Sequence, residues 1–182
     1  MTQTFTRMDQ SSAEQWAHIG EESFKDQPRV GETVLGLLES LQGVIVGFAV
    51  DQLVHSLQTA TRAERAGEDV QMVVAALCHD IGKAISIANH PRIAAEILRP
   101  YVRPELSHVI ATHQDFQGRH YYRYFDMDPE AREQYRGEPW FALGERFADE
   151  YDQTSFDPGY DTLPLAHFAP AVREVFTQAK FL

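Results

Sequence analysis

Residues 75–83, with the sequence AALCHDIGK, join an apolar helical stretch to an adjacent histidine and aspartate. A neutral imidazole nitrogen and an anionic carboxylate oxygen, side by side, can bind a divalent metal through mixed nitrogen and oxygen ligation. His79 and Asp80 alone are a weak signal, because short motifs match by chance. Further candidate ligands lie before and after this pair: His55, His90, His113 and Asp149. These six side chains are enough for two metal ions.

Helices must bring these residues together, because the candidates lie far apart in the sequence. Apolar residues at helical spacing predict one helix over about residues 50–66, which carries His55. Asp69 is a suitable N-cap for a second helix over residues 70–79, and Gly82 is well placed to end it. Ligand sites in helical bundles are built in this way, from inward side chains on facing helices.

The remaining sequence continues the helical pattern. Asn89 and Pro91 predict the start of a helix that carries His90, and Pro104 predicts the start of the next, running to about Gln114. Further expected elements are an aromatic and basic loop over residues 118–125, a helix restarting at Asp128-Pro129, one beginning at Pro139 that carries Asp149, and a closing helix over residues 165–179. Since no period-2 strand is visible, the predicted fold is all-α, a helical bundle with a two-metal site in its core.

The composition is that of one globular domain. Residues 1–30 are polar and are expected to form an N-terminal arm or lid, with a single helical core over residues 31–182. The formal net charge of −11 argues against a nucleic-acid partner, which requires a basic surface. No apolar stretch is long enough to cross a membrane, and no signal region or pair of cysteines is present. These features predict a soluble, cytoplasmic protein without a membrane partner.

The ordered set His55, His79-Asp80, His90, His113 and Asp149 resembles the motif of the HD-domain superfamily, over roughly residues 40–155. Single-metal members need only the first histidine, the HD pair and the last aspartate. The two additional histidines resemble the two-metal branches. The resemblance implies that the first metal is held by His55, His79, Asp80 and Asp149, and the second by His90, His113 and the bridging Asp80. Asp149 rests only on the local pattern RFAD, and Glu150 and Asp152 are nearby alternatives.

The stretches around residues 51–58 and 75–82 resemble one small group of this superfamily, the mixed-valent di-iron oxygenases that cleave the carbon–phosphorus bond of 1-hydroxyalkylphosphonates. The resemblance implies two iron ions (Fe2+/Fe3+), O2 as co-substrate and a small organophosphonate as substrate. The products would be inorganic phosphate and a carboxylate, either glycine betaine or glycine. The metals carry the oxidative chemistry, and the protein supplies orientation and charge neutralisation.

Two positions differ from the enzyme of this group that acts on a primary amine. Where that enzyme has a tyrosine and a glutamate, ten and seven residues before the first histidine, this chain has Ile45 and Phe48. A trimethylammonium group has no N–H to donate and prefers an aromatic face. Phe48 is therefore predicted to bind a quaternary ammonium, and Tyr122 and its aromatic neighbours are possible further walls. The alternative for Phe48 is plain core packing.

Cations are needed to neutralise a phosphonate in so acidic a protein. Lys83 follows the HD pair, Arg119 and His120 follow His113, and Arg146 precedes Asp149 by one helical turn. An arginine can pair with two phosphonate oxygens, whereas lysine acts as a point charge. Lys83 and Arg119 are the stronger candidates, since Arg146 can equally form a structural ion pair.

Two other functions compete with the dioxygenase. A metal-dependent phosphohydrolase of the same fold would attack phosphorus with a metal-bound hydroxide and would need no oxygen. A non-catalytic sensor would keep the fold, with or without the metals. The complete ligand set argues against the sensor, because an unused site is free to lose ligands.

Overall fold

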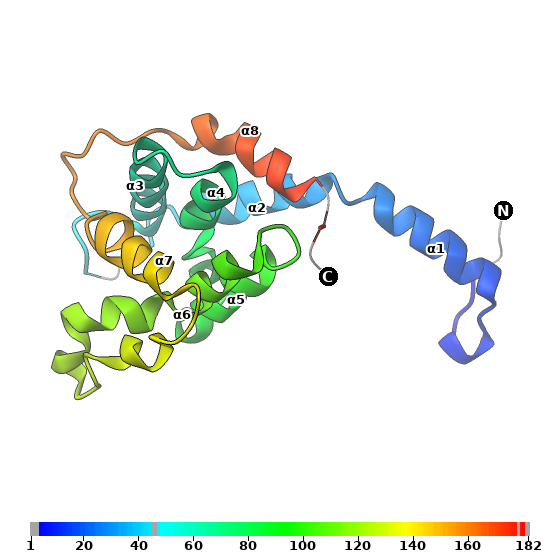
Figure 1. The fold of residues 1–182 in the computed structure, drawn as a ribbon. Helices are drawn as coiled ribbons and strands as arrows, with labels where there is room; N and C mark the ends of the chain where they lie inside the picture. The colour runs from blue at the N-terminus through cyan, green and yellow to red at the C-terminus, as the bar shows by residue number, and fades with distance from the viewer. Residues whose placement is uncertain (1–3, 45–46, 178, 181–182) are drawn as a thin grey trace.

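The computed structural model describes residues 4–44, 47–177 and 179–180, and all regular elements in these ranges are helical (Figure 1). This confirms the all-α prediction. The α-helices are α1 (Ala13–Lys25), α2 (Arg29–Glu39), α3 (Gln52–Arg65), α4 (Val70–Cys78), α5 (His90–Leu98), α6 (Pro104–Tyr121), α7 (Phe141–Arg146) and α8 (Leu165–Phe176). Short 3-10 turns are η1 (Met8–Gln10), η2 (Ile81–Ala84), η3 (Ile87–Asn89), η4 (Tyr122–Phe125) and η5 (Ala131–Tyr135), and η6 (Phe147–Asp152) is a π-helix. Within these ranges, every helix is too short or too polar to span a membrane.

Helix α4 forms the centre of the core. All its residues from Met72 to Cys78 are buried, and it contacts α3, α6 and α8. A helix that is apolar on all sides is stable only when other elements surround it. Figure 1 shows α4 in the middle of the helical body. Because His79 is the C-cap of α4, this helix delivers the His79-Asp80 pair to the interior.

Aspartate caps fix the starts of the two helices that bring the first ligands. The Asp51 carboxylate accepts hydrogen bonds from the backbone N–H of Val54 (2.8 Å) and of Gly43 (3.0 Å), so it caps α3 and ties down the preceding turn. Asp69 accepts from two N–H groups at the start of α4, which confirms the predicted cap. Such a cap stabilises a helix by about 1 kcal/mol.

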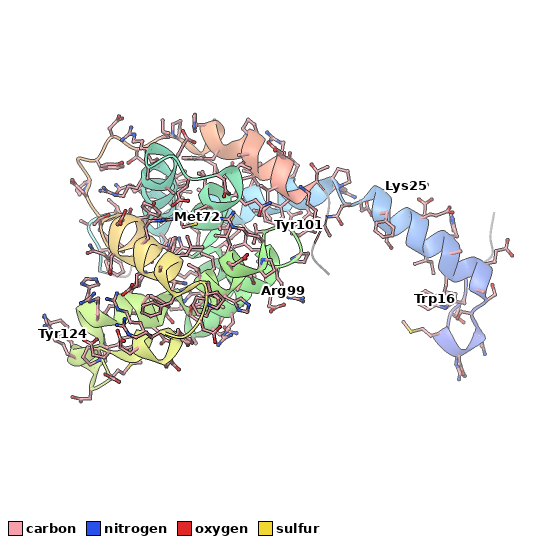
Figure 2. All side chains as sticks on the ribbon, viewed as in Figure 1. Trp16, Lys25, Met72, Arg99, Tyr101 and Tyr124 are labelled. Carbon is pink, nitrogen blue, oxygen red and sulfur yellow. The ribbon has the colours of Figure 1, made fainter. Side chains whose placement is uncertain are left out.

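Residues 4–25 extend away from the body (Figure 1), and Gln27 already contacts it, since its side-chain amide donates to the Tyr101 hydroxyl (2.7 Å). Ser12 and Gln15 form a capping box that starts α1, and no residue of this helix is buried. Figure 2 shows Trp16 and Lys25 on this arm, far from Met72 in the body. The expected arm therefore contains a helix that the sequence analysis did not predict. Its suggested use as a lid stays a prediction.

Several predicted element ends are wrong. Helix α6 continues to Tyr121 and η4 covers residues 122–125, so the predicted loop is α-helical in its first half and a 3-10 turn in its second. Gly118 lies inside α6, and the Tyr122 ring occupies the space of a side chain there; a Cβ would lie 2.5 Å from the ring. The Asn89 side chain makes no capping hydrogen bond. Beyond Pro129 only the short turn η5 forms, the next helix begins at Phe141, and the last ends at Phe176.

Gly82 does not end a helix, as the sequence predicted, because α4 already stops at Cys78. It lies in η2, where its backbone passes directly against the first residue of α5. A Cβ at this position would lie 2.3 Å from the carbonyl oxygen of His90 and 2.7 Å from its Cα. Only glycine permits this approach. The absence of a side chain at residue 82 therefore brings His90 close to Asp80.

Gly82→Ala tests this close approach. We expect a loss of about 1–3 kcal/mol in unfolding free energy, because the added methyl must displace backbone rather than a flexible side chain. Gly36→Ala is the control: Gly36 lies in α2 with no atom within 4 Å of a Cβ, so alanine should be neutral or stabilising. Chemical denaturation of both variants measures the difference. Equal stabilities would show that the start of α5 accommodates the methyl group.

Candidate metal centre

Four buried histidines converge on the carboxylate of Asp80. Oδ2 of Asp80 lies 3.4 Å from Nε2 of both His55 and His79. Its other oxygen, Oδ1, lies 3.0 Å from Nε2 of His90 and 3.5 Å from Nε2 of His113. All five side chains are at most 2% exposed. The structure thus brings together five of the six predicted ligands, drawn from α3, α4, α5 and α6.

Each of the four imidazoles has its Nδ1 against a backbone carbonyl. The acceptors are Ser155 for His55 (2.9 Å), Ala76 for His79 (2.8 Å), Ile87 for His90 (2.8 Å) and Ile110 for His113 (2.7 Å). A carbonyl only accepts, so each Nδ1 carries a hydrogen, and in the neutral ring the lone pair is on Nε2. Metal-binding histidines are oriented in this way. All four lone pairs therefore point toward Asp80.

Asp152 is the sixth member of the cluster. Its Oδ1 lies 3.2 Å from Nε2 of His55 and 3.5 Å from Nε2 of His79. We define the first half-site as His55, His79 and Asp152 beside Oδ2 of Asp80. The second half-site is His90 and His113 beside Oδ1 of Asp80. We call the six residues of both half-sites the histidine–aspartate cluster.

The cluster has the chemistry of a metal site. Ligand atoms of His55, His79 and Asp152 lie within 4.8 Å of one another, as do those of His79, Asp80 and His113. Oδ1 of Asp80 and Oδ1 of Asp152 are buried and have no hydrogen-bond partner. A buried carboxylate oxygen without a donor is costly unless a cation neutralises it. The residues present therefore fit divalent metal ions held by imidazole nitrogen and carboxylate oxygen.

The prediction that Asp149 is the sixth member is wrong, because its side chain points away from the cluster. Its Oδ2 pairs with Nη1 of Arg132 (3.1 Å). On the π-helix η6 the buried residues are Phe147, Ala148, Tyr151 and Asp152, so the core-facing side excludes Asp149. The sequence did contain the signal: the apolar stripe at helical spacing continues from residues 147 and 148 to residue 152. Asp152 had been considered only as an alternative.

Gln117 also fixes the Asp152 carboxylate, since its side-chain amide donates to Oδ2 of Asp152. This residue lies on α6, one turn after His113, and the sequence analysis missed it. With Oδ2 held by Gln117, Oδ1 of Asp152 is turned toward the two histidines. The π-helix η6 thus places Asp152, and Gln117 of α6 orients its carboxylate. A π-helix is rare and often marks a functional site.

In the metal-free protein, the carboxylates of the cluster favour protonated histidines. Burial opposes protonation of His79, but the carboxylates of Asp80 and Asp152 outweigh it and raise the pKa of His79 to about 10. The same balance raises the pKa of His55. Burial lowers the pKa of His113 and prevails there over Asp80. Burial would raise the pKa values of the two carboxyl groups, but the imidazoles, chiefly His79, hold both far below their usual range.

His55 is held by a segment from the far end of the motif. Ser155 supplies the carbonyl for Nδ1, and the Phe156 ring stacks on the imidazole with a centroid distance of 4.2 Å and an interplanar angle of 10°. This contact between distant residues was not predicted from the sequence. Phe48 continues the stack, lying 4.4 Å from Phe156, and 45% of Phe48 remains exposed. Its predicted partner position, Ile45, lies outside the described residues.

Tyr122 does not extend this aromatic surface. It is buried, and its hydroxyl donates to Oδ1 of Asp115 (3.1 Å) on the outer side of α6. Its neighbour Tyr121 is influenced by the charges of the cluster. Burial raises the pKa of Tyr121 to about 12, and the carboxylates of Asp152 and Asp80 add to the effect. Tyr124 is exposed at the end of the molecule (Figure 2).

The predicted cations divide into three groups. Lys83 borders the cluster, with Nζ 2.5 Å from Oδ2 of Asp80. Arg119 and His120 both approach Asp149, at 3.6 Å, so they lie together on the outer side of η6. Arg146 pairs with Glu68 at 2.8 Å, which is the structural ion pair considered as its alternative.

Cys78 takes no part in the cluster, although it precedes His79. It is fully buried, and burial raises the pKa of its thiol to about 12. The thiolate that a metal or an electrophile requires is therefore absent at neutral pH.

A pair of matched variants tests the corrected ligand set. We expect Asp152→Asn to weaken metal binding at least about 10-fold, because an anionic oxygen of the first half-site is lost. Asp149→Asn should bind metal like the wild type, since it removes only ion pairs on the outer side. Isothermal titration with Mn2+ and metal analysis after gel filtration measure both. The opposite ranking would restore Asp149 to the cluster.

Metal binding should release protons. Because the pKa of His79 is raised to about 10, Nε2 is protonated in the metal-free protein at pH 7, and a metal must displace that proton. The apparent affinity should therefore rise with pH from 6 to 9. Calorimetric titrations in two buffers of different ionisation enthalpy count the protons. Heats that do not depend on the buffer would mean that Nε2 is already free.

The HD domain family matches residues 53–155, which is more than half of the 182-residue chain. The match contains every member of the histidine–aspartate cluster, from His55 to Asp152. Comparison with curated proteins found no match to this chain. HD domains are typical of metal-dependent enzymes of the phosphohydrolase type, and the buried cluster agrees with that chemistry. On the family match and the geometry together, the chain belongs to the HD domain family.

Proposed function

We propose that this protein is a non-haem di-iron dioxygenase that cleaves the carbon–phosphorus bond of 1-hydroxy-2-(trimethylammonio)ethylphosphonate. The observation that carries the proposal is the position of Asp80 between two half-sites, each with two histidines. A single-metal hydrolase needs only His55, His79, Asp80 and Asp152. His90 and His113 are superfluous for that chemistry, yet they are buried, oriented by backbone carbonyls and directed at the second oxygen of Asp80.

The proposed reaction balances with O2 as the only co-substrate. The C–H and C–P bonds of the substrate supply the four electrons that reduce O2. Each product gains one oxygen atom, so the hydroxyl-bearing carbon becomes the carboxylate of glycine betaine and the phosphonate becomes phosphate. Iron in the two half-sites would supply oxygen activation and an anchor for the substrate oxygens. The protein side chains orient the substrate and neutralise its charges.

The stacked rings of Phe48 and Phe156 support a quaternary ammonium as the substrate cation. Phe156 stacks on His55 and Phe48 stacks on Phe156, so the aromatic surface begins at a member of the first half-site. A trimethylammonium group cannot donate a hydrogen bond, and an aromatic face attracts it through the ring quadrupole. No carboxylate takes the place of Phe48 in the sequence, as a primary ammonium would require.

Lys83 supports an anionic substrate. Its side chain is 14% exposed, and its ammonium group lies beside Oδ2 of Asp80, where it can attract an anion to the first half-site. Arg119 and His120 remain proposed contacts for an incoming anion, although both approach Asp149 on the outer side of η6. Arg146 is no longer a candidate, because Glu68 binds its guanidinium.

A phosphohydrolase acting on a small phosphate ester is the alternative. It is favoured by the family match itself and by the complete single-metal set in the first half-site. A bound hydroxide would then attack phosphorus, and the second half-site would assist or remain unused. The two functions differ in their metal and in their need for oxygen.

The deciding experiment is purification under anaerobic conditions with iron analysis, followed by a phosphate-release assay. Racemic 1-hydroxy-2-(trimethylammonio)ethylphosphonate is compared with its primary-amine analogue, each with and without O2. Phosphate that appears only with iron and oxygen supports the dioxygenase. Oxygen-independent release from ordinary phosphomonoesters, with Mn2+ or Co2+, would establish the hydrolase instead.

Substitution of Phe48 tests the aromatic contact. Phe48→Leu keeps an apolar side chain but removes the ring, so KM for the trimethylated substrate should rise about 2- to 30-fold, the range of a cation–π interaction. Phe48→Glu, alone and with Ile45→Tyr, should shift the preference toward the primary amine. The ratio of kcat/KM for the two substrates is the measurement. An unchanged ratio in all three variants would limit Phe48 to core packing.

A further inference from the structure

Gln52 has a buried amide that is only half satisfied. The residue is fully buried at the start of α3, and its Oε1 accepts a hydrogen bond from Nζ of Lys83 at 2.8 Å. Its Nε2 has no partner. The orientation of the amide follows from chemistry, because Nζ of lysine only donates and must therefore face the oxygen. Nε2 is thus a buried donor without an acceptor, which costs free energy in the substrate-free protein.

Gln52 also lies beside the first half-site. It precedes His55 by one turn of α3, so the two side chains emerge on neighbouring positions of one face. Lys83 links it to the cluster, because Nζ contacts both Oε1 of Gln52 and Oδ2 of Asp80. The ammonium group and the unpartnered amide therefore form one polar unit at the edge of the half-site.

We propose that Gln52 and Lys83 together bind an oxyanion, with Nε2 of Gln52 donating to a phosphonate or phosphate oxygen of the substrate. This inference rests on the proposed function only in requiring a phosphorus oxyanion, and it holds for either candidate reaction. Lys83 supplies the charge, and Gln52 supplies a neutral, directed donor. The same amide holds Lys83 in place through its oxygen, so one residue both positions the cation and contacts the anion.

Gln52→Glu and Gln52→Met both remove the donor. The glutamate keeps an oxygen for Lys83 but replaces the N–H donor with a second carboxylate oxygen, which by itself repels an oxyanion. Gln52→Met removes the donor without adding charge, and the side-chain amide resonances of Gln52 in the wild type report directly whether Nε2 contacts the anion. If Nε2 donates to the substrate, anion binding should fall on the order of 10- to 100-fold.

Gln58 offers a matched control on the same helix. It is equally buried, but both ends of its amide are satisfied, since Nε2 donates to the carbonyl of Asp157 (2.7 Å) and Oε1 accepts from the N–H of Asp157 (3.2 Å). Gln58→Glu introduces the same buried carboxylate and should lower stability. It should leave the affinity for an oxyanion unchanged.

The probes are inorganic phosphate and methylphosphonate, titrated calorimetrically into the metal-loaded full-length protein, with metal content measured for every variant. We expect Gln52→Glu, and also Gln52→Met, to bind both probes at least 10-fold more weakly than the wild type and Gln58→Glu. In the zinc-loaded wild type, phosphate should shift the side-chain amide resonances of Gln52 but not those of Gln58. This last measurement does not depend on whether a variant folds.

The outcomes separate this inference from the proposed function. Equal binding of phosphate by the wild type and Gln52→Glu, or unshifted Gln52 resonances, would overturn the oxyanion pair even if the oxygenase reaction were observed. A wild type that binds neither probe would overturn it as well. Weakened binding in both Gln52→Glu and Gln52→Met, together with shifted Gln52 resonances in the wild type, supports the pair even if no phosphate is released in the oxygen-dependent assay.

Discussion

The burial of the Asp80 carboxylate among four imidazoles is the constraint on which the rest of the structure depends. A carboxylate that is removed from water requires compensating positive charge or hydrogen bonds. Asp152 adds a second negative charge within reach of the same histidines. Without a cation the histidines must take up protons, as the raised pKa values of His55 and His79 show. Metal ions bound at the cluster would supply that positive charge instead of the protons.

The helices around the cluster bring the imidazoles to the buried Asp80 carboxylate. An apolar α4 ends at the HD pair, aspartate caps set the starts of α3 and α4, and a missing side chain at Gly82 lets α5 approach. Three of the histidines are oriented by carbonyls three residues before them, within their own local segment. His55 differs, since both its hydrogen bond and its ring contact come from Ser155 and Phe156. The first half-site is therefore the more dependent on the complete fold.

The sequence predicted those parts of the site that follow from local pattern. The helices around His55, His79 and His113 can be predicted from apolar spacing, caps and prolines, and the HD pair ends an apolar run. Asp149 was chosen from a short motif, whereas the burial pattern of η6 selects Asp152. Since ligands must face the core, the apolar stripe was the better guide.

Other features could not be read from the sequence because they arise from packing between distant segments. A glycine such as Gly118 suggests a loop in the sequence, but it lies inside α6 and leaves the space that the Tyr122 ring fills. The stacking of Phe156 on His55 and the bond from Gln117 to Asp152 join elements far apart along the chain. Such pairs have no periodic signature. The HD family match accounts for the arrangement of the ligands but not for these supporting contacts.

The two half-sites differ in how much of the chain must be in place before they exist. The second half-site is contained within residues 80–113, whereas the first needs His55, Asp152 and the Ser155 carbonyl. Closing a longer loop costs more entropy and delays the contact during folding. The pocket of His90 and His113 therefore closes at a smaller entropic cost. The first half-site is the part of the cluster that holds together α3 and the segment after η6.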